Sequence, residues 1–339
     1  MAGRYLVAGG AGFIGSHLVA GLLERGDECV VFDNLQTGHR EAVMPGARFV
    51  LGDLSDAAAL DAVLSQGVWD GVFHLADLSL VGESMREPLR YLTVNPGNAG
   101  RLISACIRHS IPRLVFSSTA NLFGTAGEGP IDEDAPISPG SPYGEGKRTT
   151  ERMLYWADQV HGLRSACLRF FNAAGADPQG RFGEDHTPET HLIPLAIDAA
   201  LGLRPPLTLF GDDYPTPDGT CIRDYIHVTD LVSAHLHALA QLEGRSVCYN
   251  LGLGQGYSVR EVIESVSRVS GRKVPHVQAA RRAGDPAILV ASSARIMRET
   301  GWVPLFTSLD AIVETALSWR RDHPHGYGGT ANSGRAQKG

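Results

Sequence analysis

A glycine-rich turn near the start of the chain limits its fold more than any other feature of the sequence. The segment AGGAGFIGSH, residues 8–17, follows the apolar run YLVAG and precedes an amphipathic stretch, so it predicts a strand, a tight turn and a helix that begins near Ile14. Glycines in such a turn let the backbone approach a pyrophosphate, whose charge would lie at the N-terminus of the helix. The residues of this predicted dinucleotide site are Gly9, Gly12, Phe13, Ile14 and Gly15.

Apolar runs alternate with amphipathic stretches through the first half of the chain. The runs YLVAG, CVVFD, ARFVLGD, GVFHLA and RLVFSS have polar residues only at their ends, as expected of strands covered on both faces of a parallel sheet. Helices are predicted between them, at 16–24, 57–64 and 92–109. This rhythm predicts a Rossmann-type doubly wound α/β fold over residues 1–175, with later segments returning to it. Residues 176–327 are expected to form mainly a smaller C-terminal α/β substrate lobe, and 328–339 a flexible tail.

An acid after the second apolar run indicates which dinucleotide is bound. Asp33 lies at the spacing where a carboxylate accepts hydrogen bonds from the adenosine ribose hydroxyls. A carboxylate there would repel a 2′-phosphate, so the sequence favours NAD over NADP. Asp53 and Leu54, expected at the end of the third strand, would flank the adenine.

Composition excludes several classes of partner. A net charge of -7, with 43% hydrophobic and 20% charged residues, argues against a nucleic-acid or membrane surface. No apolar run approaches the length of a membrane-spanning helix, and the sequence enters a strand without a charged leader, so a cytoplasmic location is expected. The five cysteines are far apart and odd in number, which predicts reduced packing residues.

The segment SPYGEGK carries the first candidate for catalysis. Tyr143 and Lys147 are four residues apart, so on a helix they share a face, and the ammonium group would favour the phenolate. Tyr143 could then accept a proton from a substrate hydroxyl. Such a pair also arises by chance on surface helices. It gains weight from FSSTANLFG, where a strand end supplies the hydroxyls of Ser117 and Thr119.

Together, the glycine-rich turn, Asp33, the serine and threonine hydroxyls and the YxxxK pair resemble the extended short-chain dehydrogenase/reductase family. Within it, VGES, SPYGEGK, LRFFNAAGA, LTLFGDDYPTPDGTCIRDYIHVTDL, YNLGLGQGYSV and RRAGD are similar in order and spacing to UDP-glucose 4-epimerases, from about residue 4 to residue 327. The resemblance implies an NAD-dependent nucleotide-sugar 4-epimerase, with UDP-glucose and UDP-galactose as the first choice of substrate. A hydride would pass from C4 to NAD⁺ to give a 4-keto sugar and return to the opposite face. Another nucleotide sugar, such as a UDP-N-acetylhexosamine or a UDP-uronate, and a dehydrogenase that releases NADH remain alternatives.

The resemblance also implies roles for individual residues. Tyr143 would act as base with Thr119 at the sugar O4, and Lys147 would hold the nicotinamide ribose. Cofactor contacts are further implied for Asn34, Leu75, Ala76, Asp77, Ser79, Asn95, Ser117 and Phe170. Substrate contacts are implied for Asn121, Asn172, His191, Leu192, Leu209, Phe210, Arg223, Arg282, Asp285 and Leu289. A homodimer through the helices near 92–109 and 143–160 is expected as well.

Local features separate related chemistries. Dehydratases of this family place an acid pair directly after the catalytic threonine, whereas Ala120 and Asn121 follow Thr119 here. His227 is expected to be structural, and Asn172 could simply cap a turn. His186 and His191 have acidic neighbours that could suggest a metal, but their irregular spacing and a reaction that needs no metal predict none.

Asp77 departs from the family pattern. Similar epimerases have a small residue at this position and often a lysine at 79, where this chain has Ser79. Next to two cofactor phosphates, an added anion should weaken cofactor retention unless Asp77 turns away, as a helix N-cap would, or pairs with a cationic or hydroxyl-rich substrate group.

Overall fold

A seven-stranded parallel sheet is the largest element of the computed structural model, which describes residues 2–124, 129–282 and 285–329. Its strands lie in the order β10-β6-β5-β4-β1-β2-β3. Their bounds are β1 (Arg4–Ala8), β2 (Glu28–Asp33), β3 (Arg48–Leu51), β4 (Gly71–His74), β5 (Arg113–Thr119), β6 (Arg164–Phe170) and β10 (Val247–Leu251). The doubly wound α/β fold predicted from the apolar runs is therefore confirmed.

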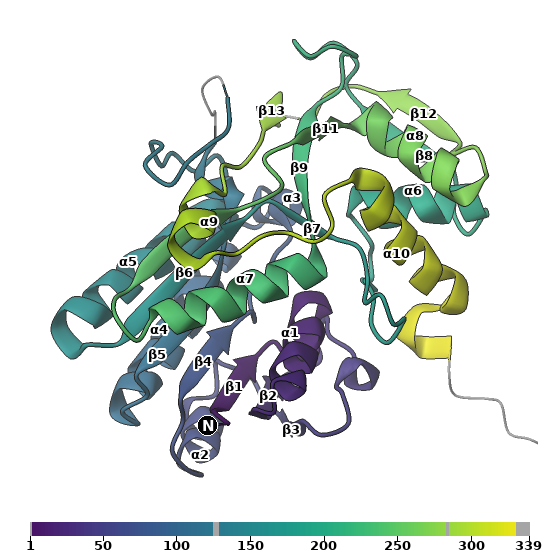
Figure 1. Ribbon diagram of the computed structural model, residues 1–339. Helices are drawn as coiled ribbons and strands as arrows, with labels where there is room; N and C mark the ends of the chain where they lie inside the picture. The colour runs from purple at the N-terminus through teal and green to yellow at the C-terminus, as the bar shows by residue number, and fades with distance from the viewer. Residues whose placement is uncertain (1, 125–128, 283–284, 330–339) are drawn as a thin grey trace, which may run out of the picture.

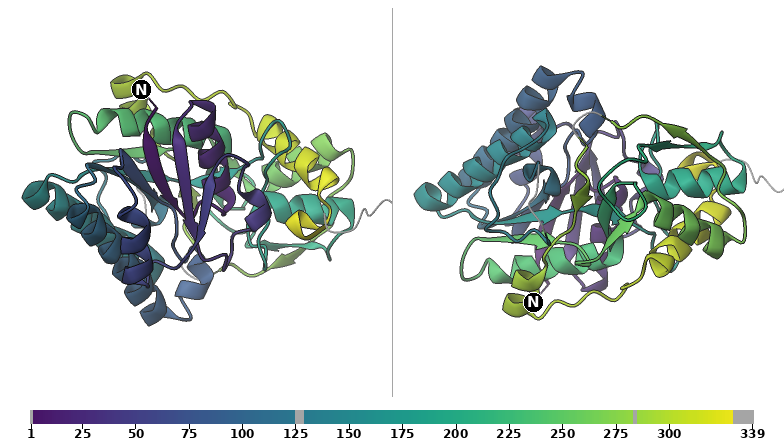
Figure 2. Two further views of the ribbon diagram at one scale, coloured as in Figure 1. Left: turned by 90° about the horizontal axis from the view of Figure 1, so that it is seen from below. Right: turned by 90° about the horizontal axis from the view of Figure 1, so that it is seen from above.

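Helices cover both faces of this sheet (Figures 1 and 2), which explains why its central strands β1 and β4 are buried along almost their whole length. Helices α1 and α7 pack together on one face, and α2, α4 and α5 on the other. Their bounds are α1 (Phe13–Glu24), α2 (Ala57–Leu64), α4 (Pro88–Arg108), α5 (Pro142–His161) and α7 (Val228–Gln241). Two clusters of buried apolar side chains, one on each side of the sheet, hold these layers together.

The turn between β1 and α1 needs glycine for steric reasons. Gly9 has a φ of +83°, and a Cβ there would lie 2.7 Å from the backbone nitrogen of Ala76. A Cβ at Gly15 would lie 2.0 Å from the carbonyl oxygen of Gly9. The predicted strand, turn and helix are confirmed, with the helix starting at Phe13.

A smaller group of elements lies to one side of the large sheet (Figure 1). Strands β7, β9, β11 and β13 form a mixed sheet, while β8 and β12 pair separately. Helices α6, α8 and α10 pack against one another around a third apolar cluster. The bounds are β7 (Asn172–Ala174), α6 (Leu192–Leu201), β8 (Leu207–Phe210), β9 (Ile222–His227), β11 (Gly256–Ser258), α8 (Val259–Ser270), β12 (His276–Ala279), β13 (Ile288–Leu289), α9 (Ala294–Thr300) and α10 (Leu309–Asp322).

Two local predictions need correction. The helix expected to start at Leu92 begins at Pro88, so Pro96 lies inside α4 and not near its start. Pro96 is buried against Gly146 of α5, whose missing side chain lets the two helices approach closely. The third strand ends at Leu51, so Asp53 and Leu54 lie beyond its end and not in it.

Other sequence-based expectations concern single residues and the chain end. Four of the cysteines are buried, Cys248 is partly exposed, and all five are free thiols, as predicted. Among the helices that the structure describes, none is both long and apolar enough to cross a membrane. The predicted flexible tail lies outside the described residues from 330 onward, as do Ala283 and Gly284 of the RRAGD segment.

Candidate active site

The candidate site lies where the chain order of the large sheet changes direction. Strands β1 and β4 are neighbours, and the strands that follow in sequence lie on opposite sides of this pair. Ligands of doubly wound sheets bind outside the carboxyl ends of the strands at such a point. The glycine-rich turn after β1, the segment 75–80 after β4 and the end of β5 all meet there, and Leu75 donates its backbone N–H to Ala8 at 2.9 Å.

Lys147 lies at the centre of this region. It extends from α5, and its Nζ donates to Asp77 Oδ2 at 2.7 Å and to the carbonyl oxygen of Ser117 at 2.6 Å. Both charged side chains are nearly inaccessible to solvent, with exposed fractions of 5% for Lys147 and 4% for Asp77. The pair therefore joins α5 to the segment after β4 through a buried ion pair.

The surroundings of Lys147 favour its charged form. Burial acts to lower its pKa, but Asp77 and Tyr143 act in the opposite direction, and the pKa is raised. Its Nζ also lies 4.7 Å from the ring centre of Phe116. The buried imidazole of His74 lies 3.7 Å from the other oxygen of Asp77, and burial lowers the pKa of His74. The lysine is thus the cation that compensates Asp77.

Tyr143 and Thr119 flank Lys147. Tyr143 is in the first turn of α5, which Ser141 caps by accepting from the backbone N–H of Gly144, and its ring centre lies 5.7 Å from Lys147 Nζ. Thr119 ends β5, and its Oγ1 accepts from the backbone N–H and the side-chain amide of Asn121, at 3.1 and 3.3 Å. Because the hydroxyl acts there only as an acceptor, its proton remains able to bind a substrate oxygen.

The expected cofactor side is formed around Asp33. The buried carboxylate accepts from the backbone N–H of Ala11 at 3.0 Å and of Leu35 at 2.8 Å, so it fixes the glycine-rich turn against the end of β2. Burial raises its pKa despite these hydrogen bonds. Beyond it, Asn34 donates to Asp53 at 2.6 Å. Asn34 and Asp53, two of the predicted cofactor contacts, are therefore hydrogen-bonded to each other, the first next to Asp33 in the chain and the second beyond β3.

Asn95 reaches this edge from α4. It accepts from the backbone N–H of Leu78 and donates to the carbonyl oxygen of the same residue, both at 2.9 Å. This clamp holds the segment that carries Asp77 and Ser79. Asn95 thus supports the expected cofactor side through the backbone of the segment 75–80.

The residues at the glycine-rich turn fit a dinucleotide. Helix α1 begins after Gly12, and none of the described side chains caps its N-terminus or places an acid in its first turn. A Cβ at Gly12 would find its nearest neighbour only at 3.5 Å, so the turn is open above this residue. Free N–H groups beside open space are the feature that a pyrophosphate needs.

The expected substrate side is formed by β8, β9 and β13. Arg223 in β9 forms an ion pair with Asp285, and Leu289 in β13 lies directly opposite Arg223 in the strand register. The guanidinium of Arg282 lies 4.1 Å from the ring centre of Phe210, the last residue of β8. In the structure these predicted residues therefore lie together and contact one another in pairs, Arg223 with Asp285 and Arg282 with Phe210. Leu209 is buried beside Phe210 and packs into the third apolar cluster.

Four predicted residues lie at the ends of helices or strands. Asn172, in β7, donates to the carbonyl oxygen of Asp224 at 2.7 Å and so ties β7 to β9. His191 precedes the first residue of α6, Leu192, and contacts Glu184. Phe170 ends β6 opposite Thr119 in β5.

His227 has a structural environment. Its Nδ1 accepts from the backbone N–H of Thr229, and its ring stacks on Phe306 with 3.7 Å between ring centres. Burial lowers its pKa to about 3, so it remains neutral, in agreement with the structural role expected from the sequence.

The partner of Asp77 was missed by the sequence-based reasoning. Helix α3 (Val81–Ser84) has Leu80 as its N-cap, so Asp77 does not cap this helix. Its partner is Lys147, 70 positions further along the chain. The only signal in the sequence was the coincidence of an added acid at 77 with a neutral Ser79.

Comparison with known proteins agrees with this arrangement. The UDP-glucose 4-epimerase of Halalkalibacterium halodurans is 48% identical over 324 residues, which are 95% of this chain and 97% of the relative. A crystal structure of UDP-glucose 4-epimerase from Brucella ovis in complex with NAD has a TM-score of 0.90 at 44% identity, covering 94% of this chain and 98% of that one. The enzyme from Bifidobacterium longum, in complex with NAD⁺ and UDP, has a TM-score of 0.92 at 33% identity, covering 96% and 100%.

The match to a family is equally extensive. Residues 5–252 match the NAD dependent epimerase/dehydratase family, and they include the glycine-rich turn, Asp33, Thr119, Tyr143, Lys147 and Arg223. The chain belongs to the NAD-dependent epimerase/dehydratase family.

Proposed function

We propose that this chain is an NAD-dependent UDP-glucose 4-epimerase that interconverts UDP-glucose and UDP-galactose. The observation that carries the proposal is the group formed by Thr119, Tyr143 and Lys147 at the carboxyl end of β5, beside a turn that fits a dinucleotide. Full-length relatives that bear this enzyme name, at 43–50% identity, support the reaction and the sugar. The NAD and UDP in the named crystal structures support the cofactor and the nucleotide.

The proposed roles follow from the chemistry of the three side chains. Tyr143 removes the proton from the sugar O4 and later returns it, and Lys147, held in its charged form by Asp77, places a positive charge 5.7 Å from the centre of the tyrosine ring. The hydroxyl of Thr119, which acts only as an acceptor toward Asn121, donates a hydrogen bond to the same oxygen. Lys147 also binds the ribose beside the nicotinamide. When bound, NAD⁺ would accept the hydride from C4 of the sugar and return it to the same carbon.

The substrate side would hold the nucleotide by charge. Arg223 and Arg282 are the proposed partners of the pyrophosphate, because guanidinium groups form charge-assisted, bidentate hydrogen bonds with phosphate oxygens. Phe210 would stack on the base and Asp285 would accept from the uridine ribose. Each of these residues now contacts another member of the group, so substrate binding must exchange those contacts.

A panel of nucleotide sugars tests the proposal. Purified protein is incubated separately with UDP-galactose, UDP-N-acetylgalactosamine and a UDP-uronate, and products are separated by chromatography while absorbance at 340 nm reports NADH. We expect conversion of UDP-galactose to UDP-glucose without added NAD⁺ being consumed. Stoichiometric release of NADH would mean a dehydrogenase, and activity restricted to another sugar would refute the choice of substrate.

We also propose a homodimer through α4 and α5. These two helices pack together and expose large apolar side chains, including Leu92, Trp156 and Val160, which are 39%, 57% and 65% exposed. Light scattering coupled to size-exclusion chromatography should give twice the chain mass, and Trp156→Glu should give monomers. The cytoplasmic location stays a prediction from the sequence.

A further inference from the structure

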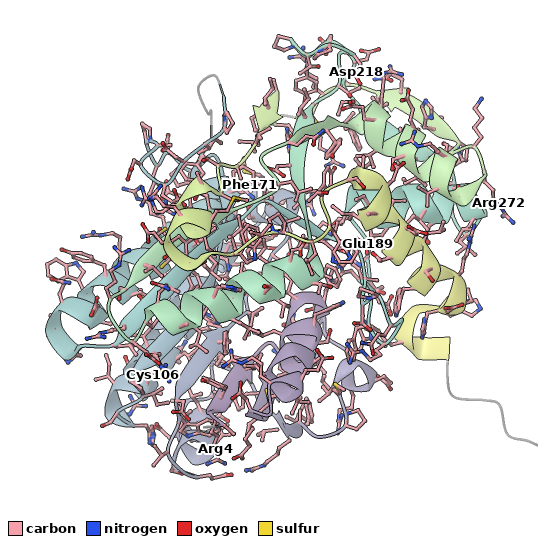
Figure 3. The ribbon with its side chains drawn as sticks, viewed as in Figure 1. Arg4, Cys106, Phe171, Glu189, Asp218 and Arg272 are labelled. Atoms are coloured by element: carbon pink, nitrogen blue, oxygen red, sulfur yellow. The ribbon has the colours of Figure 1, made fainter. Side chains whose placement is uncertain are left out.

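A compact group of metal-ligating side chains lies in the loop before α6, and three of its four members are outside the site described above. Glu184, His186, Glu189 and His191, here called the 184–191 cluster, belong to the loop between β7 and α6. Each offers one ligand atom, and these four atoms all lie within 4.8 Å of one another. Glu189 lies in the part of this loop that faces α10 (Figure 3). The proposed epimerase chemistry uses none of the three residues Glu184, His186 and Glu189.

The spacing of these atoms suits a tetrahedral ion. Zinc bound to nitrogen and oxygen at about 2.0–2.1 Å sets neighbouring ligand atoms roughly 3.3 Å apart. His186 Nδ1 lies 3.3 Å from Glu184 Oε1 and 3.5 Å from Glu189 Oε2. His191 Nδ1 is hydrogen-bonded to Glu184 Oε1, closer than two ligands of one ion, so a bound ion would have to separate these two side chains. The two imidazole rings are nearly perpendicular, at 86°, as ligands on different corners of one tetrahedron can be.

The loop backbone orients the ligands. Glu189 Oε1 accepts from the backbone N–H groups of Thr190 and His191, at 2.6 and 2.8 Å, which directs Oε2 toward His186. Asp185 points elsewhere, because its carboxylate accepts from the backbone N–H of Tyr327 at 2.9 Å. The loop backbone, and not a regular spacing in the sequence, therefore brings the four ligands together, which is why the sequence alone argued against a metal.

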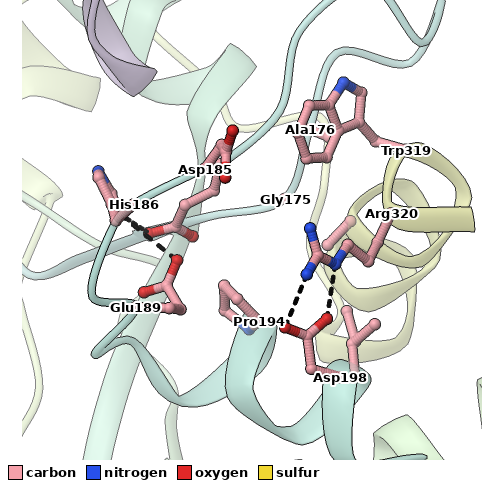
Figure 4. Close-up of a pocket in the computed structure, with 12 residues that line it drawn as sticks. Gly175, Ala176, Asp185, His186, Glu189, Pro194, Asp198, Trp319 and Arg320 are labelled. Atoms are coloured by element: carbon pink, nitrogen blue, oxygen red, sulfur yellow. Dashed lines mark hydrogen bonds and ion pairs between the residues drawn. The ribbon is translucent and has the colours of Figure 1, made fainter. Parts of the chain in front are cut away.

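A small cavity of about 40 Å³ adjoins the cluster (Figure 4). Glu184, His186 and Glu189 line it, together with side chains of α6 and α10. Across it, Arg320 is already paired with Asp198, at 2.6 and 2.9 Å. This space gives an ion a route to the buried oxygen of Glu184, whose side chain is only 5% exposed.

The charges of the cluster call for a cation. Within the part of the chain that the structure describes, Glu184 and Glu189 form ion pairs with histidines alone and with no lysine or arginine. Two carboxylates and two neutral imidazoles would balance the charge of one divalent cation, since metal-bound histidine is neutral.

We propose that Glu184, His186, Glu189 and His191 bind one Zn²⁺ per chain through two imidazole nitrogens and two carboxylate oxygens. Imidazole ligands favour zinc over magnesium or calcium, which prefer oxygen alone. Four protein ligands close the coordination shell, so the ion is structural. It fastens the loop between β7 and α6 to His191, the N-cap residue of α6, independently of whether the proposed epimerase activity is correct.

Zinc binding is measured on the full-length protein after dialysis against a chelator. Zn²⁺ is titrated in competition with a chromophoric chelator, and Co²⁺ is added separately to record its visible absorption, which is far stronger in four-coordinate than in six-coordinate sites. We expect one equivalent of Zn²⁺, an intense Co²⁺ spectrum and a zinc-dependent rise in Tm. His186→Asn and Glu189→Gln should each weaken zinc binding by roughly 100-fold or more, because even residues that only support ligands contribute 10–100-fold.

His276→Asn is the matched control, because this exposed histidine of β12 lies outside the cluster, and it should bind zinc like the unchanged protein. Circular dichroism verifies folding of each variant, and the Co²⁺ spectrum of the unchanged protein needs no variant at all. Absence of stoichiometric zinc binding, or equal affinity in His186→Asn, Glu189→Gln and His276→Asn, would overturn the proposal. The cluster would then be held by two protonated histidines.

Discussion

Replacing Asp77 by alanine tests the buried ion pair with Lys147. The variant leaves a buried ammonium group with one remaining partner, the carbonyl oxygen of Ser117 at 2.6 Å. Removing one member of a buried pair costs about 3–5 kcal/mol. Lys147 can avoid part of this cost by losing its proton, which at about pH 7.5 takes roughly 4 kcal/mol from an ordinary lysine. We therefore expect the free energy of unfolding to fall by about 3–4 kcal/mol.

The pH dependence of this loss identifies its cause. In the unchanged protein Asp77 raises the pKa of Lys147, so the stabilisation is fully present below the pKa of an unfolded lysine and is lost only above it. In Asp77→Ala the largest opposition to burial is removed, the pKa of Lys147 falls, and the unfolded state binds more protons than the folded one at alkaline pH. The variant then gains stability as pH rises, and the difference from the unchanged protein narrows by up to about 1.4 kcal/mol per pH unit.

Urea unfolding followed by circular dichroism at about pH 7.5 and pH 9.5 measures both effects. Asp77→Asn keeps an acceptor oxygen and should lose less stability than the alanine variant. Asp61→Ala, which removes an exposed partner of Arg108, should change the free energy of unfolding little at either pH. If Asp77→Ala costs as little as Asp61→Ala, or its cost does not change with pH, the reasoning about a buried, charged Lys147 is refuted.

Three further predictions concern the base, the acid stability and the packing of α7. Tyr143→Phe should lower kcat for UDP-galactose by roughly 10²–10⁴-fold, whereas Tyr155→Phe, on the exposed face of α5, should leave it unchanged; equal kcat values would exclude Tyr143 as base. Burial lowers the pKa of His235 to about 4, so the unfolded state binds the extra proton first and stability falls as pH drops below about 6.5. Between about pH 7.5 and pH 5, His235→Leu should therefore lose roughly 2 kcal/mol less than the unchanged protein in urea unfolding, and equal losses would contradict this. Asp230 accepts from the backbone N–H groups of Leu305 and Phe306 at 2.8 and 2.9 Å. Asp230→Ala should therefore lower the free energy of unfolding by about 2–4 kcal/mol in the same assay. A loss below about 1 kcal/mol would mean that water replaces the carboxylate.

Much of the fold could be predicted because its signals are local. The apolar runs are strands buried on both faces, and the positions of Gly9 and Gly15 follow from a turn that has no room for a side chain. Tyr143 and Lys147 could be paired because four residues separate them on one helix. The start of α4 at Pro88 was missed, although proline is common in the first turn of a helix, and Pro96 inside α4 packs against Gly146 of the next helix.

Contacts between distant segments could not be predicted in the same way. No periodicity links Asp77 to Lys147, or Arg223 to Asp285 across 62 positions. The 184–191 cluster is a different case, because its residues are close in sequence. There the spacing is irregular, and it is the course of the loop backbone, with Glu189 anchored by Thr190 and His191, that brings the side chains together.

The paired residues also determine how the proposed ligands must bind. Lys147, Arg223 and Arg282 are each implied to contact cofactor or substrate, and each already has a partner, in Asp77, Asp285 and Phe210. The present partners hold the three cations in place. A ligand must displace these partners, so its net gain in binding free energy is that of its own contacts minus that of the contacts it displaces. Similar epimerases have a small residue in place of Asp77, so the competition of Asp77 for Lys147 should lower the affinity for the cofactor. In Asp77→Asn, whose neutral amide competes less strongly for Lys147, we expect NAD⁺ to bind more tightly while the affinity for UDP stays the same.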